Sequence, residues 1–103
     1  MRLIIMFDLP TYTTEDKKCY TKFRKNLIHL GFNMIQYSIY TRIIKNNDDA
    51  NKYIQHIKYI LPSKGSIRLL KITEKQYANM SILLGNKSSN ELFLENIDTI
   101  LDM

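Results

Sequence analysis

The first ten residues contain a continuous apolar run that ends in an aspartate and a proline. Residues 3–7 read Leu-Ile-Ile-Met-Phe and are followed by Asp8, Leu9 and Pro10. The run is too short for a helix, is rich in β-forming residues, and is stopped by the proline. It therefore predicts a strand that is buried on both faces.

Helical spacing begins after a polar connection. Thr13 stands three residues before Asp16, which is an acidic form of the capping box, and Gly31 suits a left-handed C-terminal cap. Between them the apolar residues recur at intervals of three, four and three. The pattern predicts an amphipathic helix between Thr13 and Gly31 with an apolar stripe of Tyr20, Phe23, Leu27 and Leu30.

The period changes to two between Phe32 and Ile44. This alternation predicts one strand with an apolar face and a polar face that carries an aromatic residue. The apolar face comprises Ile35, Tyr37, Ile39, Thr41 and Ile43, and the polar face comprises Gln36, Ser38, Tyr40 and Arg42. Asn47 is then expected to cap a second helix that Pro62 ends.

Shorter elements complete the pattern. Residues 67–72 predict a third strand, Thr73 and Gln76 form a capping box for a short helix through Asn79, and residues 82–84 predict a short fourth strand. Residues 86–103 form an acidic loop with a further extended segment.

The predicted order of the elements is β-α-β, then α-β, a short helix and β. It predicts a single α+β domain over residues 1–103, a ferredoxin-like βαββαβ sandwich with an extra C-terminal strand. Both long helices would lie on one face of the sheet, so a second copy is expected to cover the other face in a homodimer.

Composition narrows the class of protein. A chain of 103 residues that is 45% hydrophobic suffices for one core without metal or disulfide support. The single cysteine, Cys19, excludes an internal disulfide and suits the reducing cytoplasm. No apolar run is long enough for a signal peptide or a membrane span, so we expect a cytoplasmic protein without a membrane partner.

Charge is unevenly distributed along the chain. The net charge is +5, but four acids follow the last base, Lys87, so residues 1–87 carry 15 bases and six acids, or +9. A segment as basic as residues 1–87 suggests a polyanionic partner. Ordinary solvated lysines explain the basic isoelectric point of the chain equally well. No acid occurs between Asp16 and Asp48, which favours phosphate binding by the predicted first helix. Its cationic stripe consists of Lys18, Lys22, Lys25 and His29, flanked by Lys17 and Arg24.

Asp8 is the main candidate for chemistry, because a strand end holds a carboxylate rigidly at a sheet edge. One carboxylate is too few for Mg²⁺, but a two-fold axis near Asp8 would supply a second. The alternative is that Asp8 caps the turn at Leu9 and Pro10. Aromatics beside an arginine, as at Tyr37, Tyr40 and Arg42, are able to stack bases, but packing in the core or in a dimer is the favoured interpretation of both tyrosines. His29, His56 and Cys19 show no zinc-site or cysteine-nucleophile pattern, and no Gly-rich phosphate loop is present.

Three stretches together resemble the small CRISPR-associated endoribonuclease family. These are residues 3–10, ending their strand in an aspartate, residues 20–25 with a Phe-Arg pair, and residues 31–40 with a Gly-Phe pair and a Gln-x-Ser-Ile-Tyr run. The residues at 73–76 resemble the short helix of members from single-effector systems. The likeness covers nearly the whole chain, and the order and spacing of the pieces make it specific.

This resemblance implies a function in spacer acquisition. Such a protein is a ferredoxin-like homodimer that bridges two dimers of the CRISPR integrase and holds the double-stranded DNA segment to be inserted. The resemblance also implies a Mg²⁺-dependent endonuclease acting on RNA or DNA, with Asp8 matching the catalytic and metal-binding aspartate, paired across the dimer. Lys17, Lys18, Lys22, Arg24, Lys25 and Arg42 are the expected nucleic-acid contacts. The alternative is a stand-alone toxin-type ribonuclease or a ferredoxin-like regulatory domain without the integrase.

Overall fold

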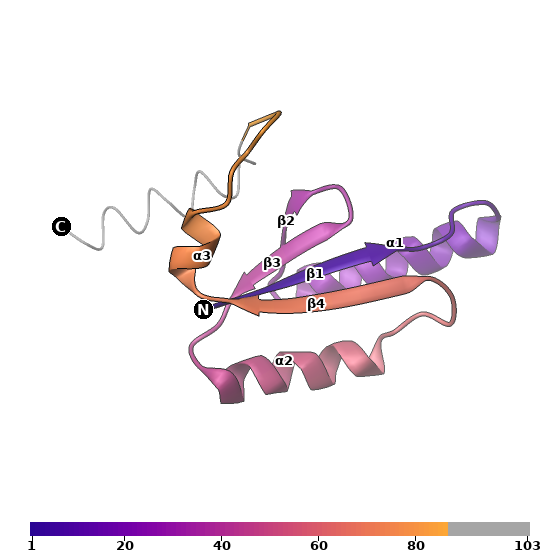
Figure 1. The fold of residues 1–103 in the computed structure, drawn as a ribbon. Coiled ribbons are helices and arrows are strands. Elements are labelled where there is room, and N and C mark those ends of the chain that lie inside the picture. Colours follow the sequence, from indigo (N-terminus) through magenta and orange to yellow (C-terminus); the bar gives the residue numbers. More distant parts are fainter. Residues whose placement is uncertain (87–103) are drawn as a thin grey trace.

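The computed structural model describes residues 1–86, which form a four-stranded antiparallel sheet with helices (Figure 1). The strands are β1 (Arg2–Asp8), β2 (Asn33–Gln36), β3 (Ile39–Ile43) and β4 (Ser66–Ile72), in the spatial order β2-β3-β1-β4. The helices are α1 (Thr14–His29), α2 (Asn47–Tyr59) and the short α3 (Glu74–Ala78). The order βαββαβ is that of the predicted ferredoxin-like sandwich.

Both long helices cover the same face of the sheet. In β1, Leu3, Ile5 and Phe7 point to this face and join one buried cluster with Phe23 and Leu27 of α1. From α2 and the adjoining segments, the cluster adds Phe32, Ile44, Ala50, Tyr53 and Ile57. The predicted α1 stripe therefore faces the core. Thr13 and Asp16 form the predicted capping box, and Gly31 has the predicted left-handed conformation with φ +87°.

The second face of the sheet lacks a long helix within the described residues. Because side chains alternate along a strand, it receives the even-numbered residues of β1. Ile4 is buried but stands outside the helix-side cluster, while Ile43 is 41% and Leu70 is 50% exposed. Register places further apolar side chains on this open face, so that it comprises Ile4, Met6, Ile39, Ile43, Leu70 and Ile72.

The single strand predicted over residues 32–44 is wrong, because the chain folds back within it. Gln36 pairs with Ile39, so Tyr37 and Ser38 form a two-residue turn between β2 and β3. Ser38 has φ +61°, a left-handed conformation that glycine or asparagine usually supplies at such turns. The sequence has neither residue at this turn, and alternation continues through it, which concealed the hairpin.

The prediction of faces on this segment was also wrong. Tyr40 is 1% exposed and lies in the helix-side cluster, opposite Ile5 of β1. Arg42 follows on the same face by alternation, whereas Ile39 and Ile43 lie on the open face. The apparently polar face of the alternation is therefore the face that the helices cover.

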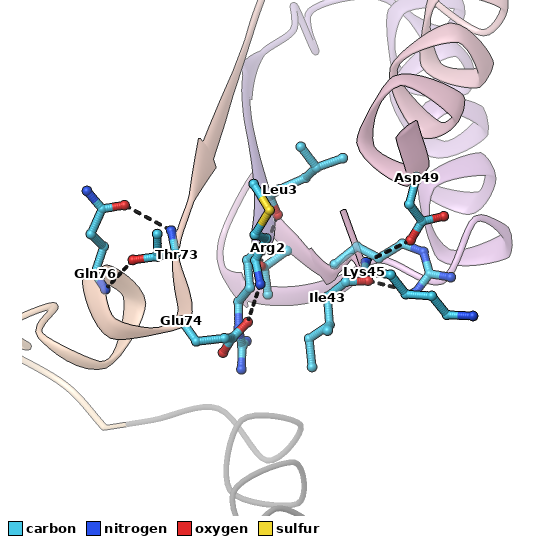
Figure 2. Close-up of polar contacts among 11 residues, drawn as sticks. Arg2, Leu3, Ile43, Lys45, Asp49, Thr73, Glu74 and Gln76 are labelled. Atoms are coloured by element: carbon cyan, nitrogen blue, oxygen red, sulfur yellow. Dashed lines mark hydrogen bonds and ion pairs between the residues drawn. The ribbon is translucent and has the colours of Figure 1, made fainter. Parts of the chain in front are cut away.

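The short helix α3 is anchored at the start of β1 (Figure 2). Arg2 is 6% exposed, and its Nε donates hydrogen bonds of 3.0 Å to both carboxylate oxygens of Glu74. Its guanidinium carbon lies 3.8 Å from the centre of the Tyr77 ring. Thr73 and Gln76 form the predicted capping box at the beginning of α3. These contacts explain how a helix with no buried residue holds its place.

Two smaller predictions need correction. The cap of α2 is Asn46, whose side chain accepts from the backbone N–H of Asp49, and Asn47 is already the first helical residue. Residues 82–84 do not form a strand, and Leu83 and Leu84 are 94% and 95% exposed. The predicted C-terminal strand lies outside the described residues. Within residues 1–86, no helix combines the length and apolar character needed to cross a membrane.

Candidate nucleic-acid interface

Asp8 occupies the end of β1, opposite Ser66 of β4. Its even position places it on the open face of the sheet, and its side chain is exposed. Gly65 approaches the same strand end with φ +104°, and a Cβ atom there would lie 2.6 Å from the Asp8 carbonyl oxygen. Glycine at position 65 therefore permits the close approach that fixes the backbone at Asp8.

The Asp8 carboxylate has no hydrogen bond or ion pair among residues 1–86, so no turn-capping contact is present there. Those residues also contain no group of three histidine, cysteine or acidic side chains that could hold a metal ion. At this strand end residues 1–86 therefore offer Mg²⁺ one free carboxylate, which is too few ligands for that ion. A complete site needs oxygen ligands from outside these residues, such as those of a second copy or of a bound nucleic acid.

The cationic stripe of α1 forms a continuous exposed surface. Its lysines all reach solvent, and a shallow hollow runs between them. We call this the α1 basic surface: Lys17, Lys18, Lys22, Lys25 and His29, with the polar Thr14, Thr21 and Asn26 between them. From Lys18 to His29 it extends about 16 Å, at about 1.5 Å per residue. That length matches roughly half a turn of duplex DNA, whose turn spans about 34 Å.

The two predicted arginine contacts differ from these lysines. Arg24 is exposed on α1, but its Nε donates a 2.9 Å hydrogen bond to the Tyr40 hydroxyl. Arg42 is half-buried between Gly31 and α2, where it donates to the Tyr53 hydroxyl and lies 4.2 Å from the centre of that ring. The structure therefore brings the four lysines together on one surface and places Arg42 within the helix layer.

A row of aromatic rings connects the core to the hairpin turn. The Phe7 ring is 5.1 Å from Phe23 and 5.8 Å from Tyr20, and Tyr20 stacks on Tyr37 at 6.0 Å with an interplanar angle of 19°. Tyr37 is 72% exposed. The favoured interpretation of both tyrosines was packing in the core or in a dimer. Tyr40 lies in the core, whereas Tyr37 does not, and packing of Tyr37 in a dimer stays a prediction. The signal that would have revealed the exposed ring is the turn, which the sequence pattern concealed.

The stacked pair also affects proton binding at the turn. The pKa of Tyr37 is raised above its ordinary value of 10.0. The largest cause is the interaction with the Tyr20 hydroxyl, and the second is charge repulsion from the same residue. The Tyr20 hydroxyl itself shares a 3.1 Å hydrogen bond with the Ser38 hydroxyl. The turn and the helix are thus connected by both rings and hydroxyl groups.

Comparison with known proteins places these features in a family. Residues 1–80 match the family model of CRISPR associated protein Cas2. The chain is 54% identical over 87 residues to the CRISPR-associated endoribonuclease Cas2 of Ligilactobacillus salivarius, covering 84% of this chain and 86% of that one. It is 46% identical over 85 residues to the protein of the same name from Acidovorax ebreus, covering 82% and 83% of the two chains.

The fold has a counterpart among solved structures. The crystal structure of Streptococcus pyogenes Cas2 at pH 6.5 superposes with a TM-score of 0.59, covering 81% of this chain and 99% of that one at 15% sequence identity. At that identity the likeness concerns the fold. The family match over most of the chain and the identities of the relatives confirm the resemblance read from the sequence, and the chain belongs to the Cas2 family of CRISPR-associated proteins.

Proposed function

We propose that this protein is a nucleic-acid-binding homodimer of CRISPR adaptation, which bridges integrase dimers and holds the double-stranded DNA segment to be inserted. The observation that carries the proposal is the α1 basic surface. Its four lysines are exposed and close together, and no acid lies between Asp16 and Asp48 to neutralise them. A surface of this kind binds the phosphate backbone without reading the sequence, as a scaffold for DNA of any sequence requires.

The homodimer is supported by the open face of the sheet. An apolar sheet face exposed to water is unfavourable, and the described part of the chain contains no long helix to cover it. Pairing of two such faces would bury side chains such as Leu70 and Ile43. It would also bring two copies of the Asp8 strand end into one particle, and it would give the assembly a two-fold axis for symmetric integrase partners.

The second part of the proposal is a Mg²⁺-dependent endonuclease activity at Asp8. The relatives from L. salivarius and A. ebreus carry the name endoribonuclease. The Asp8 carboxylate is free of other protein contacts among residues 1–86, and the backbone that carries it is fixed by Gly65. Paired Asp8 carboxylates would hold the ion that supplies Lewis-acid chemistry for phosphodiester hydrolysis.

Two variants separate the DNA scaffold from the nuclease. The first, Lys22→Glu with Lys25→Glu, reverses two charges of the α1 basic surface. It should weaken duplex binding at least tenfold. It should also make the slope of log affinity against log salt less steep by about 2, because each lost phosphate contact removes about 0.9 from its magnitude. The second, Asp8→Asn, should leave duplex binding unchanged or slightly tighter, and it should abolish cleavage at millimolar Mg²⁺. Fluorescence anisotropy and a gel-based cleavage assay provide the two measurements.

A matched control distinguishes local contacts from overall charge. Lys58→Glu with Lys75→Glu changes the net charge by the same amount at exposed positions of α2 and α3. It should weaken duplex binding much less than the α1 reversal. Equal effects of the two double variants, or an affinity that ignores salt, would contradict the assignment of the surface. Cleavage by pure Asp8→Asn protein would remove Asp8 from the site.

A further inference from the structure

The exposed ring of Tyr37 stands in an unusual position for a large aromatic side chain. It lies at a tight turn, where it is 72% exposed, and it contacts Tyr20 through one face only among the described residues. An aromatic ring that is open to water buries little apolar surface of its own. Its contribution to the core is therefore small, and what distinguishes it from the more exposed Tyr12 and Tyr59 is its stacking on a second ring.

The ring is supported by its neighbours through stacking and hydrogen bonds. Tyr20 supports it from behind, and Tyr20 is itself fixed by the ring of Phe7 and by the hydroxyl of Ser38. The carbonyl oxygen of Ser38 accepts a 3.1 Å hydrogen bond from the backbone N–H of Phe7, which ties the turn to the end of β1. Ser38 holds a left-handed conformation, φ +61°, which is strained for a residue with a side chain. Such strain often occurs at functional positions, and here it presents the Tyr37 ring.

The surroundings of the ring are cationic on the helix side. Tyr20 belongs to α1, and Lys17 and Arg24 lie one turn before it and one turn after it, both exposed. Residues three and four apart share a helix face, so both cations flank the stacked pair. Asp16 lies on the same face, but its carboxylate accepts a hydrogen bond from the backbone N–H of Thr13 at the beginning of the helix. On the strand side, the hydrogen bond from Phe7 places the turn next to the residue that precedes Asp8.

A supported aromatic ring with one free face, bordered by cations, is the arrangement that binds unpaired bases. The base stacks on the ring while lysine and arginine contact the neighbouring phosphates. Bases within a duplex are not accessible to such a ring, because both faces of each base are already stacked. We propose that Tyr37 is the stacking platform for an unpaired base of a single-stranded nucleic acid segment that passes the Asp8 end of β1. This inference deepens the proposed function, on which it rests, by assigning single-stranded recognition to the Tyr37 ring, with Lys17 as the cation that this site shares with the α1 basic surface.

The test compares single strands with and without bases, using the full chain. Wild-type protein should bind a short oligothymidylate more tightly than an abasic phosphodiester strand of the same length. Tyr37→Ala should weaken oligothymidylate binding by about tenfold and remove this preference, and Tyr37→Phe should retain both. Duplex affinity should stay within about twofold for both variants. Tyr59→Ala is the matched control, since Tyr59 is 89% exposed and has no interaction partner among the described residues.

A spectroscopic readout tests contact directly. The chain has no tryptophan, so Tyr37→Trp introduces a single indole whose emission should be quenched by oligothymidylate and not by the abasic strand. Tyr59→Trp should show no such quenching. Retention of the base preference by Tyr37→Ala, or quenching that is equal at both positions, would overturn the platform. So would a shift in monomer–dimer equilibrium without loss of single-strand affinity, which would assign the ring to a second copy of the chain.

The two proposals fail in different ways. If Tyr37→Ala has no effect while the Lys22 and Lys25 reversal weakens duplex binding, the stacking platform is refuted and the proposed function stands. If the lysine reversal has no effect on either kind of nucleic acid, the proposed function itself is refuted.

Discussion

Truncation of Leu27 to alanine should destabilise the protein far more than the same change at its neighbour, Ile28. Both residues lie in α1, and each substitution removes three carbon atoms from the side chain. Leu27 is 0% exposed within the core cluster, whereas Ile28 is 47% exposed. At about 0.8 kcal/mol per buried carbon, Leu27→Ala loses about 2.4 kcal/mol of transfer free energy. The cavity left beside the rings of the core raises this to about 3–4 kcal/mol.

The exposed neighbour provides the control on the same helix. Ile28→Ala leaves no closed cavity, about half of its side chain is already in water, and alanine is the better helix former, so the loss should stay below about 1 kcal/mol. Urea unfolding followed by circular dichroism measures both variants at one fixed protein concentration, because dimerisation would make stability depend on concentration. With a slope of about 1.5 kcal/mol per molar urea, the Leu27 variant should shift the midpoint by roughly 2 M. Equal shifts for the two variants, or a loss below about 0.5 kcal/mol at Leu27, would refute the orientation of α1.

Three further outcomes follow from the structure. Gly65→Ala should cost at least about 2 kcal/mol in urea unfolding, since its Cβ would lie 2.6 Å from a backbone atom. Gly85→Ala meets no atom of residues 1–86 within 4 Å and should cost only the left-handed strain of about 1 kcal/mol. An alkaline absorbance titration should show a tyrosine step above the ordinary value of 10.0, because the pKa of Tyr37 is raised, and Tyr37→Phe should remove this late step. Because its folded pKa is raised above the unfolded value, its contribution to stability is complete below pH 10 and is lost as the pH rises through the folded pKa. Sedimentation at micromolar concentration should give about twice the 12.2 kDa chain mass, and a monomer there would count against the paired sheet faces.

Local signals in the sequence were sufficient for the helices but not for the hairpin. Capping boxes at Thr13 and Thr73 and the glycine at position 31 act within one helical turn, so the residues that form them are visible in the sequence. The turn at Tyr37 and Ser38 instead depends on pairing between β2 and β3, which overrides the weak turn preference of its own residues. A reversal of chain direction leaves alternation intact, so periodicity alone cannot detect it.

The candidate site was predictable to a similar extent. Asp8 lies at the expected strand end because an apolar run and a proline delimit that strand. The exposure of the α1 lysines follows from the stripe of apolar residues on the opposite side of the helix. Arg42 could not be placed, because its contacts with Gly31 and Tyr53 come from segments that only the folded chain brings together. The exposure of Tyr37 was hidden for the same reason.

The different surroundings of lysines and arginines have a consequence for chemical modification. Arg2 is buried and Arg42 is half-buried, whereas the exposed charge of α1 resides in four lysine amines and one guanidinium group, that of Arg24. Acylating reagents neutralise lysine amines, and arginine stays protonated at any ordinary pH. Graded acetylation should therefore remove the positive charges of the exposed lysines stepwise. Arg2 and Arg42 should keep their contacts, and the domain should remain folded.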